Sequence, residues 1–269
     1  MTEAELLFSE LLNCDRTALY QARNFPLNKN KLSAASSVLK RRISSIPIQY
    51  ILGKTEFMGL EFKLTPEVLI PRPETEIVVE TAIKYLSALR EERPALNILE
   101  LGSGSGCIAV SLAKFLVDVE IDAVDISGKA LKVARFNAQH NGVAQRIRFI
   151  KSDLFLSCAL KEKDYDLIIS NPPYVASGEI DNLAPEIKYE PRIALDGGRE
   201  GLDFYRRIIS QAPDYLKEAG ILIMELGFNQ AASIKNIFKN SGYFKIMGFV
   251  KDYNNIDRVV VAKRIGAHG

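Results

Sequence analysis

Apolar runs and amphipathic segments alternate along the chain from about residue 95 onward. The expected strands are, in chain order, 97–101, 119–125, 146–153, 165–170, 220–226, 243–250 and 257–263. Helical spacing of apolar residues separates several of them, over 107–116, 127–142 and 230–240. Strands that alternate with helices of this length predict a mostly parallel sheet covered on both faces. No helix separates the last two strands, so we expect the final strand to run antiparallel as a hairpin partner.

The first 46 residues have a different, helical pattern. Apolar residues recur at helical spacing in "EAELLFSELL" and "KLSAASSVLKRRI", and "RNFPLNKN" interrupts them with asparagine and proline. The next segment, 48–72, is rich in β-branched and aromatic residues and contains glycines at positions 53 and 59. This composition predicts a hairpin or extended linker that ends at a stiff Pro-Arg-Pro sequence.

A helix is expected to begin near Pro73. Glu74 and Glu76 would then lie in its first turn, where acidic side chains interact favourably with the helix dipole. The chain is therefore predicted to be an α/β protein with a small helical N-terminal domain. The predicted parts are a helical domain (1–47), a β-hairpin linker (48–72) and the α/β domain (73–269).

Composition narrows the class of protein. The chain has 269 residues, of which 47% are hydrophobic and 25% charged, as in ordinary globular proteins, and its formal charge is only +2. A net charge this small does not indicate a nucleic-acid or membrane partner. The three cysteines (Cys14, Cys107 and Cys158) are scattered, so we predict neither a disulfide framework nor a metal site. The acidic start and the lack of a long apolar stretch predict a cytoplasmic protein without a membrane partner.

The stretch "LELGSGSGCIAV" places glycines at positions 102, 104 and 106 between an expected strand and helix. Glycines there permit a tight turn and let backbone N–H groups approach a ligand. The spacing G-x-G-x-G differs from the dinucleotide fingerprint G-x-G-x-x-G, and this loop has no Gly-Lys-Ser/Thr of a P-loop. The alternative is a plain strand–helix turn without a ligand.

Two aspartates follow at the ends of the next two expected strands. Asp125 comes roughly 20 residues after the glycine loop, where an acid can accept hydrogen bonds from both hydroxyls of a ribose. Its alternative role is to cap the next helix, although Ser127 can supply that cap instead. Asp153 can accept from the amino group of an adenine, with Leu154 packed on the ring, or it can be a turn residue. The glycine loop and these acids indicate an adenosine compound without a pyrophosphate.

The short glycine loop after an acidic-apolar strand, "ILELGSGSG", resembles the S-adenosylmethionine-dependent methyltransferases of the Rossmann-like type. The resemblance implies S-adenosyl-L-methionine as the cofactor and a Rossmann-like sheet. It implies that the loop cradles the methionine part, that Asp125 holds the ribose, and that Asp153 and Leu154 flank the adenine. The loop residues are Gly102, Ser103, Gly104, Ser105 and Gly106.

An unusual turn ends the strand in "LIISNPPYV", residues 167–175. Prolines end strands because they lack the N–H that a ladder needs, and this alone is one explanation of the turn. Among methyltransferases of this type, however, Asn-Pro-Pro-Tyr implies methylation of a planar nitrogen, either a glutamine amide or an exocyclic amine of adenine. The Asn171 side-chain oxygen and the Pro172 carbonyl can accept both N–H bonds of such a group and aim it at the sulfonium methyl.

We therefore expect Asn171, Pro172 and Tyr174 to be catalytic residues. Tyr174 offers a face to the plane of the substrate. Pro173 joins these three in the predicted substrate site, and Asn171 is also assigned to the cofactor site.

Three longer segments are similar to one family, the protein-(glutamine-N5) methyltransferases of peptide chain release factors. They are "RISSIPIQYILGKTEFMGLEFKLTPEVLIPRPETE", "NPPYVASGEIDNLAPEIKYEPRIALDGGREGLDFYRRII" and "GILIMELGFNQ". The resemblance implies methylation of the glutamine of a Gly-Gly-Gln motif in a release factor, a step of translation termination, with no nucleic acid as direct substrate. Ser103 stands where the family usually has threonine, and both residues offer a hydroxyl.

The N-terminal segment 23–54 contains seven lysines and arginines and no acidic residue. If these side chains form one basic surface, that surface can attract an acidic partner or RNA. It can equally be an ordinary solvated helix surface. Two other classes of function also remain open. A nucleic-acid adenine methyltransferase would share the Asn-Pro-Pro-Tyr turn but usually needs a strongly basic surface. A non-enzymatic nucleotide-binding module would keep the glycine loop and would have no use for Asn171 and Tyr174.

Overall fold

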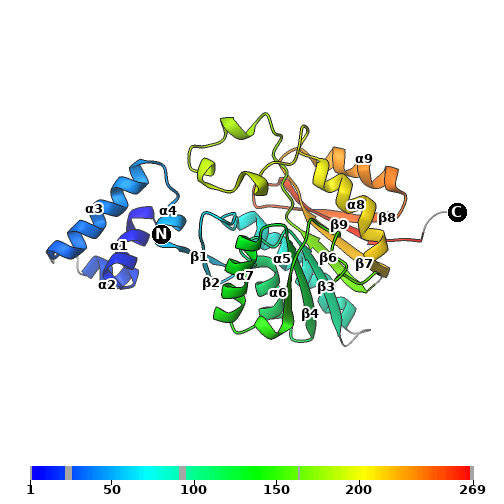
Figure 1. Cartoon of the computed structure of the whole chain (residues 1–269), viewed down its shortest axis with the longest axis horizontal. Helices are drawn as coiled ribbons and strands as arrows, with labels where there is room; N and C mark the ends of the chain where they lie inside the picture. The colour runs from blue at the N-terminus through cyan, green and yellow to red at the C-terminus, as the bar shows by residue number, and fades with distance from the viewer. Residues whose placement is uncertain (1, 22–25, 91–94, 163, 267–269) are drawn as a thin grey trace.

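A computed structural model describes residues 2–21, 26–90, 95–162 and 164–266. Arg23, the first of the basic residues noted above, and part of the "RNFPLNKN" break lie outside these ranges. Figure 1 shows two lobes, a small one built from the N-terminal helices and a larger one built around a twisted sheet. The helices of the small lobe are α1 (Glu3–Leu12), α2 (Arg16–Gln21), α3 (Lys29–Ile43) and α4 (Ile48–Leu52).

Two side-chain caps begin the helices of the small lobe. Thr2 and Glu5 form a capping box at the start of α1, and the Asn28 side chain accepts a hydrogen bond from the backbone N–H of Lys31 at the start of α3. These bonds satisfy N–H groups that have no partner inside a helix. The helical pattern predicted for this region is confirmed.

Helix α4 differs from the expected extended structure. Its Ile48 and Tyr50 are buried, and the helix packs against α1 and α3. Pro47 precedes it, and Gly53, with φ of 75°, ends it in a left-handed conformation. Burial of these side chains thus outweighs their β-propensity.

A hairpin connects the two lobes. Its strands are β1 (Lys54–Phe57) and β2 (Leu60–Lys63), which pair antiparallel around a turn at Met58 and Gly59. Phe57 and Phe62 are buried with their rings edge to face, 6.0 Å between centroids, and they belong to the core of the larger lobe. The hairpin is therefore fixed to the sheet lobe, while the division at residues 47 and 72 stays a prediction.

The large sheet has seven strands in the order β5-β4-β3-β6-β7-β9-β8. Their bounds are β3 (Leu96–Leu101), β4 (Val119–Asp125), β5 (Ile147–Lys151), β6 (Tyr165–Ser170), β7 (Leu216–Glu225), β8 (Phe244–Lys251) and β9 (Asp257–Arg264). The first five of these, β3 to β7, run parallel, and β9 runs antiparallel to both β7 and β8. The predicted mostly parallel sheet and its antiparallel last strand are confirmed.

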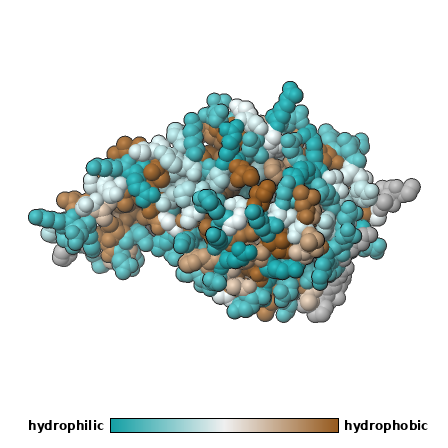
Figure 2. Space-filling view, viewed as in Figure 1, coloured by the Kyte–Doolittle hydropathy of each residue, from teal (hydrophilic) through white to brown (hydrophobic). Residues whose placement is uncertain are grey.

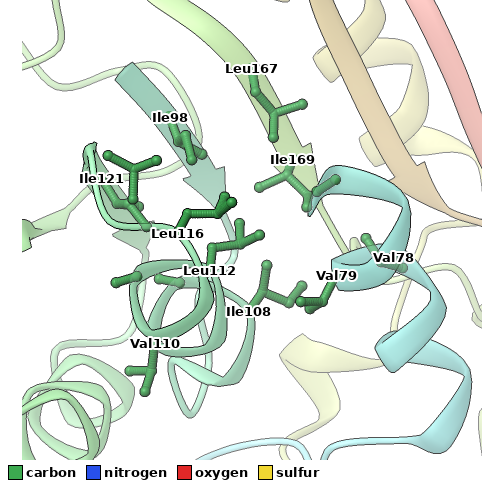
Figure 3. Close-up of a cluster of buried hydrophobic side chains, with 14 of the residues drawn as sticks. Val78, Val79, Ile98, Ile108, Val110, Leu112, Leu116, Ile121, Leu167 and Ile169 are labelled. Carbon is green, nitrogen blue, oxygen red and sulfur yellow. The ribbon is translucent and has the colours of Figure 1, made fainter. Parts of the chain in front are cut away.

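Helices cover both faces of this sheet. Alternate residues of the strands point to opposite sides, so that Ile98 joins one buried cluster and Leu99 the other. Helices α5 (Pro73–Arg90), α6 (Cys107–Phe115) and α7 (Gly128–His140) pack on the first face, and α8 (Asp203–Tyr215) and α9 (Ala231–Ser241) pack on the second. Figure 3 shows Ile108 and Leu112 of α6 pointing toward Ile98, Leu167 and Ile169 of the sheet. Parallel strands buried on both sides place all their carboxyl ends at one edge, where the predicted site residues lie.

The segment between β6 and α8 contains three short 3-10 turns and crosses that edge toward the N-terminal lobe (Figure 1). Across the described part of the chain, none of the helices combines the length and the apolar character that a bilayer crossing requires.

Candidate active site

A cavity of about 200 Å³ lies at the carboxyl ends of β3, β4, β5 and β6. Each of the four strands contributes residues that directly follow it, and α8 closes one side with Phe204 and Arg207. The strand-end residues in its wall are Leu101, Gly102, Gly104, Asp125, Ile126, Ser127, Ser152, Asp153, Leu154, Ser170, Asn171, Pro172 and Pro173. The structure thus brings together most of the predicted site residues.

The glycine loop uses left-handed backbone conformations, with φ of 76° at Gly102, 53° at Gly104 and 81° at Gly106. Gly102 and Gly104 line the cavity, whereas Ser103 and Ser105 are each only 3% exposed and do not. Gly106 begins helix α6, and a Cβ there would lie 3.0 Å from the Cβ of Ala134 in α7. Three of the five predicted loop residues therefore support the loop from behind instead of facing the cavity.

The side chain of Asp125 bridges two loops at the cavity wall. Its Oδ1 accepts from the backbone N–H of Ser127 at 2.8 Å, and its Oδ2 accepts from that of Gly104 at 2.7 Å. The cap of α7 is Ser127, whose hydroxyl oxygen accepts from Ala130 N at 3.1 Å. Burial raises the pKa of Asp125, and the two N–H donors act in the opposite direction. The alternative role of Asp125 as the helix cap is thus taken by Ser127.

Asp125→Ala should weaken binding of S-adenosylmethionine by roughly 1.5–3 kcal/mol, the size of hydrogen bonds to a charged group. The physical reason is the loss of a carboxylate that lines the cavity beside the glycine loop. Calorimetric titration measures the change, and the melting temperature of the variant reports any loosening of the two loops. Unchanged affinity would leave Asp125 a purely structural residue.

Asp153 lies in the turn after β5, which ends at Lys151, and not at the end of the strand itself. Its Oδ1 forms an ion pair with Arg207 at 2.8 Å. Leu154 is 7% exposed and has a φ of 50°, which is uncommon for a residue other than glycine. Such strain is more frequent at functional sites than elsewhere, and both residues line the cavity.

A second cavity of about 220 Å³ adjoins the first. Asn171 and Pro172 line both cavities, Pro173 lines only the first, and Tyr174 lines only the second. The second cavity is mainly apolar, and its other lining residues are Leu69, Arg72, Val175, Leu183, Ile187, Ala194 and Leu195. The Asn-Pro pair therefore stands at the boundary between two spaces, one next to the glycine loop and one under the segment that follows β6.

Hydrogen bonds fix the orientation of the Asn171 side chain. Its Nδ2 donates to the hydroxyl oxygen of Thr75 at 3.0 Å, so Oδ1 is directed away from helix α5. The Thr75 hydroxyl in turn donates to Oε2 of Glu225 at 2.7 Å. The Tyr174 hydroxyl lies 3.5 Å from the other oxygen of Glu225. Sequence reasoning missed Thr75 and Glu225, although an acid inside the apolar run "GILIMEL" was a usable signal.

The glycines of "DGGREG" let the chain lie directly on the Asn-Pro-Pro-Tyr turn. A Cβ on Gly197 would be 2.8 Å from the Pro173 carbonyl oxygen, and one on Gly201 would be 2.3 Å from that of Tyr174. The Gln230 side chain donates to the carbonyl oxygens of both Tyr174 and Gly201, at 3.0 and 3.2 Å. The turn is therefore held in place by this loop and by the Gln230 side chain.

A partly buried ion pair joins the Pro-Arg-Pro segment to the loop after β6. Arg72 donates to Oε1 of Glu190, whose side chain is only 1% exposed, and Ile70 N donates to Oε2 at 3.4 Å. Burial raises the pKa of Glu190, and Arg72 opposes this effect. The pair joins the start of α5 to the loop after β6 and so shapes the second cavity from two sides.

A further buried acid, Glu100, lies two residues before the glycine loop begins. Burial raises its pKa from 4.5 to about 8, although the backbone N–H of Ala109 donates to it. Between these two values the folded protein binds a proton that the unfolded chain releases, so this contribution to stability is complete below about 4.5 and is lost as the pH rises through about 8. The free energy of unfolding should therefore fall by at most about 1.4 kcal/mol per pH unit from this group.

Glu100→Gln should remove that part of the pH dependence. Urea unfolding of the wild-type protein and the variant at pH 5.5 and 7.5 makes the comparison. An identical pH dependence in both proteins would mean that Glu100 is ionised in the folded state.

Residues 1–53 of the chain match a family model described as the PrmC N-terminal domain, and residues 79–198 match the methyltransferase small domain. A release factor glutamine methyltransferase of Geobacter sulfurreducens is 44% identical over 265 residues, which cover 98% of this chain and 89% of the relative. The chain belongs to the release factor glutamine methyltransferases. Another member of the family, from Clostridium acetobutylicum, is 38% identical over 99% of this chain and 92% of its own length.

Solved structures with lower identity agree on the fold alone. The hMettl16 catalytic domain, in complex with the MAT2A 3'UTR hairpin 6, aligns with a TM-score of 0.59 at 18% identity, covering 76% of this chain and 75% of that one. A methyltransferase from Pyrococcus furiosus aligns with a TM-score of 0.55 at 20% identity, covering 85% of this chain and 98% of that one. This family member is thus a methyltransferase with a Rossmann-like sheet, as the sequence predicts. Its family and fold imply S-adenosylmethionine as the usual cofactor.

Proposed function

We propose that this enzyme transfers a methyl group from S-adenosyl-L-methionine to the side-chain amide nitrogen (N5) of the glutamine in a Gly-Gly-Gln motif of a peptide chain release factor. The observation that carries the proposal is the position of Asn171 and Pro172 in the walls of both cavities. A methyl donor in one cavity and an amide in the other would meet at these two residues. The names of the relatives supply the class of substrate, a release factor glutamine.

The first cavity suits an adenosine compound with a positively charged sulfur. Gly102 and Gly104 leave room for close backbone contact, and the partly buried Asp125 carboxylate can accept from ribose hydroxyls. Leu154, Ile126 and Phe204 provide apolar surfaces for an adenine ring. S-adenosylmethionine held by these residues would supply an electrophilic methyl group.

The residues of the Asn-Pro turn bind and orient the nucleophile. An amide nitrogen is a weak nucleophile because its lone pair is delocalised, so alignment has a large effect on rate. The Asn171 Oδ1 and the Pro172 carbonyl accept its two N–H bonds. As the N–C bond forms, the nitrogen gains positive character, which these two dipoles stabilise. The bond between the methyl group and the sulfonium sulfur would break at the same time, so that neutral S-adenosylhomocysteine would leave. One N–H proton would then pass to solvent water, and it is acidic enough at that stage that no strong base is required.

The second cavity suits a glutamine between small neighbours. It is narrow and mainly apolar, and Tyr174 forms part of its wall next to Asn171. Two glycines beside the glutamine would let a peptide backbone enter without clashing side chains. Selection of one glutamine among many then requires contacts away from the cavity.

We propose that the N-terminal lobe makes those contacts. Two residues of its basic stretch, however, are already paired with acids of this protein. Arg42 is engaged with Glu3 and Glu186, and Lys54 with Glu10 and Glu61, so neither is offered to a partner. The α3 residues Lys40 and Arg41 remain exposed. The same helix also exposes apolar side chains, Leu39 at 48% and Ile43 at 83%. Figure 2 shows hydrophobic surface on this lobe, and such a mixed surface suits docking of a protein.

Reversal of both exposed charges, Lys40→Glu with Arg41→Glu, should lower kcat/KM on a whole release factor by roughly 10-fold, as expected for loss of favourable long-range attraction. The rate on a short Gly-Gly-Gln peptide should not change, because a peptide does not reach this lobe. Lys84→Glu with Lys239→Glu, on helices of the sheet lobe, is the control of equal charge change. Equal losses on both substrates would assign α3 to the fold and not to docking.

Methyl transfer from labelled S-adenosylmethionine to a release factor, a Gly-Gly-Gln peptide, DNA and RNA tests the function directly. We expect incorporation into the whole factor, much less into the peptide, and none into nucleic acid. Incorporation into adenine with none into the release factor would favour a nucleic-acid methyltransferase instead.

A further inference from the structure

A chain of buried hydrogen bonds connects Asn171 to strand β7. It runs from Asn171 Nδ2 to Thr75 Oγ1 over 3.0 Å, and from Thr75 Oγ1 to Glu225 Oε2 over 2.7 Å. Thr75 is 2% exposed and Glu225 is 1% exposed. Neither residue is in the wall of either cavity, so an effect on the reaction must act through a neighbour that is, either Asn171 or Tyr174, whose hydroxyl lies 3.5 Å from Glu225.

Glu225 determines which group donates and which accepts in each of these two hydrogen bonds. A carboxylate only accepts hydrogen bonds, so the single hydroxyl proton of Thr75 is used on Glu225. Thr75 Oγ1 can then only accept from Asn171, which requires the NH₂ end of the amide. The two ends of a carboxamide are nearly alike in shape, so packing alone would select between them poorly.

We propose that Thr75 and the Glu225 carboxylate are positioning residues that determine which end of the Asn171 amide meets the nitrogen to be methylated. The inference rests on the function proposed above, in which Asn171 Oδ1 accepts a hydrogen bond from the substrate. A reversed amide would place its own NH₂ against the substrate NH₂, and two donors cannot bond. The substrate amide would then lose one of its two fixed contacts.

The charge of Glu225 is open to control by pH. Its pKa is raised to about 7, because burial and, to a smaller extent, Glu74 raise it more than Thr75, Arg258 and Tyr174 lower it. Two other groups interact with it electrostatically, the buried Cys107 thiol and the Tyr205 hydroxyl, and burial raises the pKa of each. Once protonated, Glu225 can donate to Thr75, whose own proton is then free to turn toward Asn171. The reversed amide therefore becomes accessible as the pH falls below about 7, because Thr75 is no longer obliged to donate to Glu225.

The first test removes the Thr75 hydroxyl, which links Asn171 to Glu225. Thr75→Val keeps the shape and removes the hydroxyl, and we expect kcat to fall roughly 10- to 100-fold, the equivalent of a hydrogen bond in a charged network. Affinity for S-adenosylmethionine should stay unchanged, and Thr75→Ser should restore most of the rate. Thr81→Val, another buried threonine of the same helix, controls for the loss of a buried hydroxyl. Equal rates for the valine and serine variants at position 75 would overturn the proposal.

The second test uses the pH profile on the release factor. The wild-type rate should rise with pH through about 7, and Glu225→Gln should remove this limb because a glutamine does not titrate. A limb of the same midpoint in the variant would contradict the role of the carboxylate. A wild-type enzyme that methylates no glutamine would overturn the proposed function, whereas glutamine methylation that Thr75→Val leaves unchanged would overturn only this inference.

Discussion

Replacement of Asn171 by alanine should lower the maximal rate of methyl transfer by roughly 100-fold or more, the usual loss of one preorganised polar group at a reacting centre. Asn171 stands between the two cavities, and its oxygen is directed away from α5 by the bond to Thr75. Without it, the substrate NH₂ would keep only the Pro172 carbonyl as an acceptor. Its rotation would then carry the nitrogen lone pair away from the methyl group.

The effect should be confined to the rate. Calorimetric titration of the Asn171→Ala protein with S-adenosylmethionine should give an affinity close to that of the wild type, since the glycine loop and Asp125 are untouched. Asn182→Ala, at an exposed position in the segment after β6, is the matched control and should keep the wild-type rate. A variant that lost cofactor affinity and kept its maximal rate would reverse the role assigned to Asn171.

Gly201→Ala should be strongly damaging although Gly201 lines neither cavity. A Cβ at this position would lie 2.3 Å from the Tyr174 carbonyl oxygen, so the Asn-Pro-Pro-Tyr turn must shift to admit it. Displacement of catalytic groups by about 1 Å can lower a rate by roughly 100-fold. We expect a loss of this size in kcat/KM together with a lower free energy of unfolding.

Gly142→Ala separates the two causes of damage. Gly142 has a φ of 73°, close to the 70° of Gly201, but a Cβ there would meet no atom within 4 Å. Both variants therefore carry the cost of about 1–2 kcal/mol for a left-handed alanine, and only Gly201→Ala adds the collision. Similar activity of the two variants would show that the loop does not hold the turn in place.

The sequence predicts the sheet well because its strands are buried on both faces and end at strong turn signals. The strands expected at 119–125 and 165–170 coincide with β4 and β6, and helix α5 begins at Pro73 as expected. The glycine loop, Asp125 and the Asn-Pro-Pro-Tyr turn are found together for the same reason. Each directly follows a parallel strand, and such strand ends share one edge of the sheet.

Long-range contacts of polar side chains were beyond prediction from the sequence. Thr75 and Glu225 meet although 150 positions separate them, and Arg42 pairs with Glu186 across the two lobes. Local patterns contain no signal for such pairs. Similarly, Ser103 and Ser105 are buried because the three glycines that flank them adopt left-handed conformations, and the spacing G-x-G-x-G alone does not predict those conformations.

Mass spectrometry of a release factor treated with the enzyme and isotopically labelled S-adenosylmethionine is the most direct test of the central claim. Fragmentation of the modified peptide should place one methyl group on the side-chain nitrogen of the glutamine in the Gly-Gly-Gln motif. The same reaction with the Asn171→Ala enzyme should give almost none. A methyl group on any other residue of the factor, or a factor left unmodified by the wild-type enzyme, would contradict the function proposed for the two cavities.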